Sequence, residues 1–184
     1  AACPGRGQVG ALAELLDRVQ PRQVAEFGSG LTTRFWATRS DARIVTWDNY
    51  EDWIAKLRAT FAGEPWIRRV EWRHYIVIPE GSRAVEKEPV PWQGDAFDFV
   101  FIDGPRSAHA PNFGRSGSFR FATRHTREGG LIVWHDAHRP HERQMARRYL
   151  GHCRRSRIGT LGWCSWEPKG GGVRQLVNRL NPAT

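Results

Sequence analysis

The chain has 184 residues, 40% of them hydrophobic and nine of them tryptophan, which is enough for one domain of ordinary size with a filled core. No apolar run approaches the ~18 residues of a membrane span, and three scattered cysteines exclude a disulfide framework or a cysteine-based zinc site, so we expect a cytoplasmic protein. The net charge of +9 would suit nucleic acid, but only three of the 28 basic residues are lysines and no basic run exceeds two, so we expect no nucleic acid partner.

The N-terminal part of the chain predicts a helix, a strand and a second helix. The first helix, over residues 7–19, has apolar residues at helical spacing: Val9, Leu12, Leu15, Leu16 and Val19. Residues 23–27 then predict a short buried strand, and residues 31–39 predict the next helix. Gly28-Ser29-Gly30 joins the two, and its glycines let the backbone turn tightly and approach a ligand.

This glycine turn predicts a nucleotide-type cofactor. A dinucleotide fingerprint requires Gly-x-Gly-x-x-Gly, whereas Thr33 stands here in place of the third glycine. Glu26 lies two places before the first glycine. A carboxylate there would repel a pyrophosphate but suits a cationic ligand, such as the amino acid end of S-adenosylmethionine.

Residues 43–47 predict a second strand, which ends at Asp48, 20 residues after Gly28. A carboxylate at this place can accept hydrogen bonds from both hydroxyls of a ribose, although an aspartate in an ordinary turn can also act as a cap. We expect Asn49 to cap the next helix, in which three apolar residues share one face: Trp53, Leu57 and Phe61.

The rest of the chain predicts three further strands, two helices and a hairpin. Strands are expected over residues 69–78, 97–102 and 131–134, helices over 118–127 and 140–150, and a closing hairpin within 155–178. The nearly all-apolar strand 97–102 ends at Asp103-Gly104-Pro105 and is typical of a central parallel strand. The long loop 79–95 is expected to be functional or mobile, and residues 105–117 form a second polar loop.

Strands that alternate with helices predict an α/β fold, namely a Rossmann-like, doubly wound, mostly parallel sheet with a C-terminal antiparallel hairpin. We expect a single domain over residues 1–184, with an N-terminal helix region (1–20), a cofactor-binding core (21–150) and the closing hairpin (151–184). Ligands of such sheets bind beyond the carboxyl ends of the strands. The polar residues at these ends should therefore converge on one crevice: Glu26, Asp48, Asp103, His135 and Asp136.

In this order the motifs resemble those of class I S-adenosylmethionine-dependent methyltransferases. The matching segments are Glu26 to Gly30, Asp48, Phe97 to Pro105, and Gly129 to Val133, within a resemblance that covers about residues 7–150. The resemblance implies that the glycine turn surrounds the methionine moiety and that Asp48 binds the ribose. The cofactor-binding residues are then Glu26, Gly28, Ser29, Gly30, Thr32, Asp48 and Asn49. The position that usually binds adenine has no match, and the loop after Ile78 is the only candidate.

Asp103, His135 and Asp136 are the candidates for chemistry. Together they could hold a divalent ion such as Mg²⁺. Catechol-type and sugar-type O-methyltransferases resemble this layout but have acidic or amide ligands, so His135 departs from their pattern. Alternatively His135 acts as a general base near neutral pH, or only caps the following helix. We expect Asp103 and His135 to be catalytic, by helping the acceptor to lose its proton.

The acceptor is expected to be a small molecule that has an oxygen nucleophile and can carry an anionic group. Arg106 and Arg139 are the candidates for holding its anionic group, and Trp92 could line a pocket for its ring. The other arginines that flank the strand ends are expected to be solvated: Arg115, Arg120, Arg124 and Arg143. A partner subunit could complete the site in a homo-oligomer. An RNA methyltransferase, a nicotinamide-dependent oxidoreductase and a non-catalytic scaffold remain as alternatives.

Overall fold

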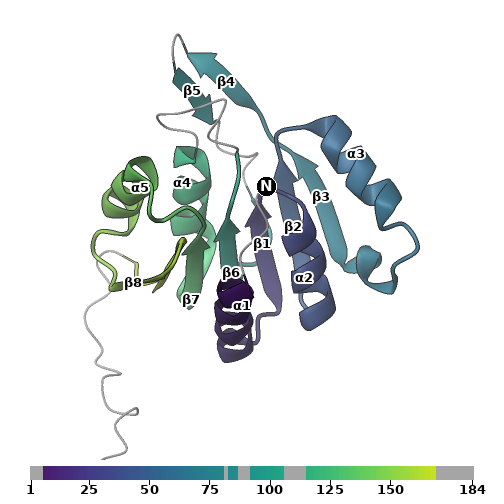
Figure 1. Cartoon of the computed structure of the whole chain (residues 1–184), viewed down its shortest axis with the longest axis horizontal. Coiled ribbons are helices and arrows are strands. Elements are labelled where there is room, and N and C mark those ends of the chain that lie inside the picture. Colours follow the sequence, from purple (N-terminus) through teal and green to yellow (C-terminus); the bar gives the residue numbers. More distant parts are fainter. Residues whose placement is uncertain (1–5, 81–82, 87–91, 106–114, 169–184) are drawn as a thin grey trace, which may run out of the picture.

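The computed structural model describes residues 6–80, 83–86, 92–105 and 115–168 (Figure 1). The helices are α1 (Arg6–Val19), α2 (Leu31–Arg39), α3 (Glu51–Thr60), the 3-10 helix η1 (Pro65–Arg69), α4 (Ser116–His125) and α5 (Pro140–Leu150). The strands are β1 (Gln23–Phe27), β2 (Arg43–Asp48), β3 (Val70–His74), β4 (Val77–Glu80), β5 (Arg83–Glu86), β6 (Phe97–Ile102), β7 (Thr126–Trp134), β8 (Arg155–Ile158) and β9 (Leu161–Ser165).

The main sheet has seven strands in the order β3-β2-β1-β6-β7-β9-β8. The first five of these are parallel, β9 runs antiparallel to β7, and β8 pairs antiparallel with β9. The chain proceeds outward from β1 to β3 and then returns to place β6 on the other side of β1. The boundary between β1 and β6 is therefore the topological switch point, where such sheets bind ligands. The predicted doubly wound fold with its C-terminal hairpin is confirmed.

Helices pack on both faces of the sheet. On one face, α1 and α2 contribute Leu12, Leu16 and Trp36 to a core with Phe99 and Phe101 of β6. Figure 1 shows these two helices in front of the sheet. The opposite core contains residues of α4 and α5, among them Phe119, Phe121, Met145, Ala146 and Leu150. Because β6 is buried on both faces, its nearly continuous apolar sequence is explained.

The predicted third strand was too long. β3 ends at His74, and the apolar residues that follow belong to β4, which pairs antiparallel with β5 in a separate two-stranded sheet. Part of the predicted loop 79–95 is therefore a hairpin, and β5 lies against α4. Figure 1 shows the hairpin beyond the carboxyl ends of the parallel strands. Apolar residues 75–78 follow β3 without a break, so the sequence pattern alone does not reveal where the chain leaves the main sheet.

The boundary between α4 and β7 was also misplaced. Helix α4 ends at His125, and β7 begins at Thr126, ahead of the glycine pair that was expected to introduce it. Gly129 has a φ of +76°, and the pairing of β6 with β7 shifts register near Phe97, so the glycines lie at an irregularity inside the strand. In the part of the chain that the structure describes, no helix is long and apolar enough to cross a membrane.

Candidate functional site

The ends of four neighbouring strands are held level by backbone hydrogen bonds. The amide of Gly28 donates to Trp47 O at 2.8 Å, that of Asp103 to Phe27 O at 2.8 Å, and that of His135 to Ile102 O at 2.9 Å. Each bond extends the parallel ladder one residue beyond a strand. The polar residues that follow these strands therefore lie along one edge of the sheet, as expected from the topology.

The two glycines of the turn have different roles. Gly28 has a φ of +95°, and a Cβ there would lie 2.8 Å from the backbone nitrogen of Gly104. The turn after β1 thus packs directly against the backbone that follows β6, which requires glycine. Gly30 has an extended backbone with a φ of 171°, and a Cβ built on it would meet no atom within 4 Å. The space beside Gly30 is open.

Glu26 lies beneath the glycine turn. Its side chain is fully buried, and its carboxylate accepts hydrogen bonds from the hydroxyls of Thr33 and Thr46 and, at 2.9 Å, from Trp36 Nε1. Burial raises the pKa of Glu26 to about 7, although these hydrogen bonds and one from Thr32 oppose the shift. The Glu26 carboxyl group therefore supports the glycine turn through the side chains to which it is bonded. Because it is fully buried, we no longer expect it to contact a cationic ligand directly.

Thr33 explains the missing third glycine. Its hydroxyl accepts from the amide of Gly30 at 2.9 Å and donates to Glu26. The hydroxyl joins the first turn of α2 to the end of β1, so a side chain is required where a dinucleotide fingerprint has glycine. Ser29 is buried beside it, and its hydroxyl shares a hydrogen bond of 2.8 Å with Thr46.

The raised pKa of Glu26 predicts a pH-dependent stability. Between its ordinary value of 4.5 and about 7, the folded protein holds a proton that the unfolded chain has lost. The free energy of unfolding should therefore fall as pH rises through this window, by about 3 kcal/mol in total. Glu26→Gln should remove this fall, which thermal unfolding between pH 4.5 and 8 measures.

Glu128→Gln serves as the control, because it makes the same chemical change at a glutamate that is exposed to solvent. It should keep the wild-type dependence of melting temperature on pH. Equal slopes in the wild type and both variants would show that the buried Glu26 carboxyl is not the group responsible.

Asp48 is buried at the end of β2, and backbone amides hold its carboxylate. Ser29 N donates to one oxygen and Tyr50 N to the other, each at 3.0 Å. Burial raises the pKa of Asp48, and these amides, together with that of Asn49, oppose the shift. The prediction that Asn49 caps α3 was wrong, because Tyr50 is the N-cap residue and makes no side-chain cap. Asp48 instead accepts the hydrogen bond from the Tyr50 amide at the start of α3.

Three exposed apolar side chains near Asp48 were missed from the sequence. Tyr50, Trp53 and Ile76 have exposed fractions of 45%, 39% and 55%. Trp53 donates from Nε1 to Ser29 O at 2.9 Å, so its indole lies against the glycine turn. The sequence analysis placed Trp53 on the same helix face as Phe61. Positions eight residues apart differ by about 80° around a helix, so this angle could have indicated that Trp53 and Phe61 do not share one buried face.

At the ends of β6 and β7 lies a buried cluster. His135 Nδ1 is 2.9 Å from Asp103 Oδ1 and 3.8 Å from Asp136 Oδ1. Asp136 has a φ of 60°, a strained backbone conformation of the kind that gathers at functional sites. Because a carboxylate can only accept, the Asp103 contact favours the tautomer with its proton on Nδ1. One potential ligand atom from each of these three residues lies within 4.8 Å of the others.

Arg115, which was expected to be solvated, is at the centre of this cluster. Its side chain is only 4% exposed. It donates to the carbonyl oxygens of Asp103 at 3.0 Å and His135 at 2.9 Å, and to Asp136 Oδ2 at 3.0 Å. The guanidinium is also 3.5 Å from Asp103 Oδ1 and 3.8 Å from Glu142 Oε1. No sequence pattern marked it, because its contacts come from β6, β7 and α5 together.

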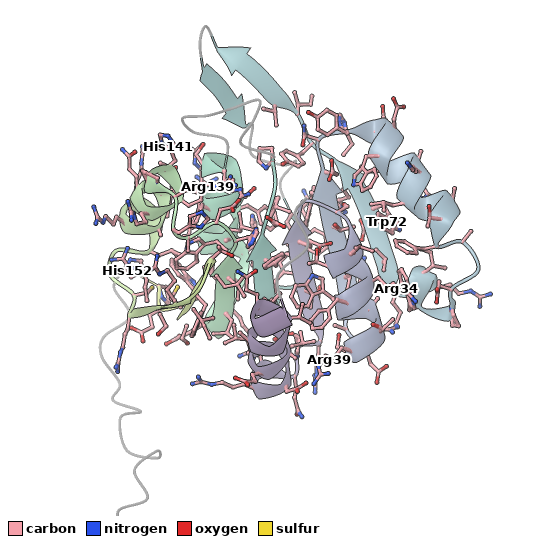
Figure 2. The ribbon with its side chains drawn as sticks, in the orientation of Figure 1. Arg34, Arg39, Trp72, Arg139, His141 and His152 are labelled. Atoms are coloured by element: carbon pink, nitrogen blue, oxygen red, sulfur yellow. The ribbon has the colours of Figure 1, made fainter. Side chains whose placement is uncertain are left out.

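The three predicted substrate residues lie in different surroundings. Arg139 directly precedes α5, near α4 (Figure 2). Its Nη1 is 3.1 Å from Asp136 Oδ2. Arg106 lies outside the described residues. Trp92 is buried in the core with its ring against Phe97 and Trp47 and the guanidinium of Arg73 above it. This packing gives Trp92 a structural role, so we do not retain it as a substrate contact.

Comparison with known proteins identifies relatives by structure only, since no family model and no curated protein sequence matches the chain. It is similar to an O-methyltransferase from Bacillus cereus in complex with S-adenosylhomocysteine (TM-score 0.60, 19% identity, 90% of this chain and 83% of that chain covered). It is also similar to an O-methyltransferase of tomaymycin synthesis from Streptomyces achromogenes in complex with S-adenosylmethionine (0.61, 16%, 90% and 82%). A methyltransferase-like protein from Silicibacter pomeroyi gives 0.66, 16%, 92% and 89%. At these identities the similarity establishes a shared fold.

Proposed function

We propose that this chain is an S-adenosylmethionine-dependent methyltransferase that acts on an oxygen of a small molecule. The observation that carries the proposal is the alignment of the glycine turn, Asp48 and the Asp103–His135 pair along one edge of the sheet, at its switch point. The cofactor and the acceptor would then meet between β1 and β6–β7. Solved proteins of the same fold that bind S-adenosylmethionine or S-adenosylhomocysteine support this reading.

The residues present fit this cofactor. The open space beside Gly30 suits the methionine moiety, and the Asp48 carboxylate is held by amides in an orientation from which it can accept ribose hydroxyls. We propose that the exposed side chains of Tyr50, Trp53 and Ile76 flank the adenine, because a flat apolar base suits such surfaces. Thr33 disfavours a dinucleotide, since its hydroxyl is part of the turn itself.

When bound, S-adenosylmethionine supplies an electrophilic methyl group on its sulfonium. The protein must align the acceptor oxygen with that group and receive the acceptor's proton. We assign proton acceptance to Nε2 of His135, because Nδ1 is directed at the Asp103 carboxylate. Asp103 is then a positioning residue that sets the tautomer and stabilises the imidazolium. Arg139 is the proposed contact for an anionic acceptor group, since 40% of its side chain is exposed beside Asp136.

Calorimetric titration with S-adenosylhomocysteine tests the cofactor assignment, with NAD⁺ as the competing ligand. We expect micromolar affinity for the first and no binding of the second. Asp48→Asn should weaken the affinity by about 10- to 100-fold, because it removes the charge from hydrogen bonds to the ribose. Asp41→Asn, at an exposed aspartate, is the matched control and should have no effect. Binding of NAD⁺ instead would make the protein an oxidoreductase candidate.

An RNA methyltransferase remains the second candidate because of one basic segment. Residues 143–166 contain no acidic residue, and their exposed arginines lie on α5 and around β8: Arg143, Arg147, Arg148, Arg154, Arg155 and Arg157. A segment with this charge attracts phosphate backbones. Tight RNA binding that weakens steeply with salt would favour this candidate, and weak binding at physiological salt would leave the small-molecule acceptor.

A further inference from the structure

We infer that Arg115 is the resident cation of the cluster at the ends of β6 and β7, and that this cluster is built to work without a divalent metal. A role of Arg115 in catalysis rests on the proposed methyl transfer, whereas its effect on metal binding depends only on the charge and the hydrogen-bond donors of the cluster.

Arg115 lies where a metal would have to lie. Nη2 of Arg115 lies 3.0 Å from Asp136 Oδ2 and 3.5 Å from Asp103 Oδ1, so it bridges the two carboxylates that a metal would need to bridge. The same guanidinium donates to the backbone carbonyls at the ends of both strands. The guanidinium is therefore held both by the backbone and by the two carboxylate side chains. Its removal would leave several buried acceptors without a hydrogen bond.

The charge of the cluster also disfavours a metal. Three buried carboxylates, those of Asp103, Asp136 and Glu142, face the guanidinium groups of Arg115 and Arg139. With His135 counted as neutral, one formal negative charge remains, which is too little to attract a divalent ion into a site that already contains a buried cation. Hard divalent ions require several carboxylate or carbonyl oxygens, and here arginine hydrogen bonds occupy Asp136 Oδ2 and the carbonyl oxygens of Asp103 and His135.

One ring nitrogen of His135 is already engaged. Nδ1 is directed at Asp103 Oδ1 at 2.9 Å, so only Nε2 remains as a ring ligand, and Mg²⁺ prefers oxygen ligands to imidazole. The guanidinium of Arg115 lies 3.5 Å from the same Asp103 oxygen, and the contact of that oxygen with His135 favours the tautomer with its proton on Nδ1. The donor set thus fits an Asp–His pair with an arginine as its cation, and it does not fit a Mg²⁺ site. Arg115 acts as a positioning residue for both partners.

The test is binding of Mn²⁺ to the full chain, measured by electron paramagnetic resonance with Mg²⁺ as competitor. The wild-type protein should show no binding in the micromolar range. Arg115→Ala leaves two uncompensated negative charges and frees the carboxylate oxygens, so it should bind Mn²⁺ about tenfold more tightly or better. Arg115→Lys keeps the charge and should not gain a site.

Arg69→Ala is the matched control. Arg69 is a half-buried arginine that donates to three backbone carbonyls, and within the part of the chain that the structure describes it forms no ion pair with a carboxylate. It should bind no Mn²⁺. Where Arg115→Ala does not fold, Arg115→Met removes the charge but keeps much of the stem and carries the same expectation.

Two results would overturn the inference. One is micromolar Mn²⁺ binding by the wild-type protein that Asp136→Asn abolishes, which would restore the metal site. The other is a folded, neutral variant of Arg115 that gains no Mn²⁺ affinity. Neither result depends on turnover, so failure here is distinct from failure to bind S-adenosylhomocysteine, which would instead reject the proposed function.

Discussion

Replacing His135 by glutamine should lower kcat for methyl transfer by about 10²- to 10⁴-fold, the usual contribution of a general base. The imidazole is buried, and Asp103 Oδ1 lies 2.9 Å from Nδ1, which leaves Nε2 to accept the acceptor's proton. Glutamine keeps a similar size and can still bond to Asp103, but it cannot take up a proton. The affinity for S-adenosylhomocysteine should stay near the wild-type value, because no contact in the glycine turn changes.

The measurement is S-adenosylhomocysteine formation with a panel of small phenols and alcohols, using an acceptor that the wild-type protein methylates. Asp103→Asn provides a graded comparison, since it keeps the shape but no longer fixes the tautomer of His135. It should lower kcat by a smaller factor and shift the pH profile of kcat. Full activity of His135→Gln would assign proton removal to another group or to water. Lost cofactor affinity would give His135 a structural role.

Replacing Gly30 by valine should abolish most cofactor binding while the fold survives. The Gly30 backbone is extended, and a Cβ there meets no atom within 4 Å, so the folded protein has room for a side chain. In the proposed complex the cofactor fills that room. Overpacking of about 1–3 kcal/mol corresponds to an affinity loss of about 10- to 100-fold for S-adenosylhomocysteine, which calorimetry measures.

Gly63→Val is the matched control, because a Cβ at the exposed Gly63 also meets no atom within 4 Å and the residue lies in the turn after α3. It should bind S-adenosylhomocysteine as the wild-type protein does. The two variants should have similar melting temperatures without ligand, and only Gly30→Val should lose the rise in melting temperature that the ligand produces. Unchanged binding by Gly30→Val would move the proposed cofactor away from the turn.

The sequence predicted the architecture correctly wherever the pattern of apolar residues matches the burial in the fold. The apolar run 97–102 is β6, the glycine turn follows β1, Asp48 ends β2, and Asp103 and His135 follow β6 and β7. These predictions succeeded because strand burial and backbone turns leave a direct trace in residue type. The β4–β5 hairpin was missed because apolar residues follow β3 without a break, and the start of β7 was missed because its glycine pair lies inside the strand. Only strand pairing decides where these strands begin and end.

The sequence by itself therefore determined a doubly wound sheet and the polar residues at the carboxyl ends of its strands. Tertiary structure decided what those residues do. It buried Glu26 among hydroxyl and indole donors, packed Trp92 into the core and placed Arg115 between the carboxylates of Asp103 and Asp136. The physical reason is that a charge's role depends on the dielectric and the partners around it, which come from elements far apart in the chain.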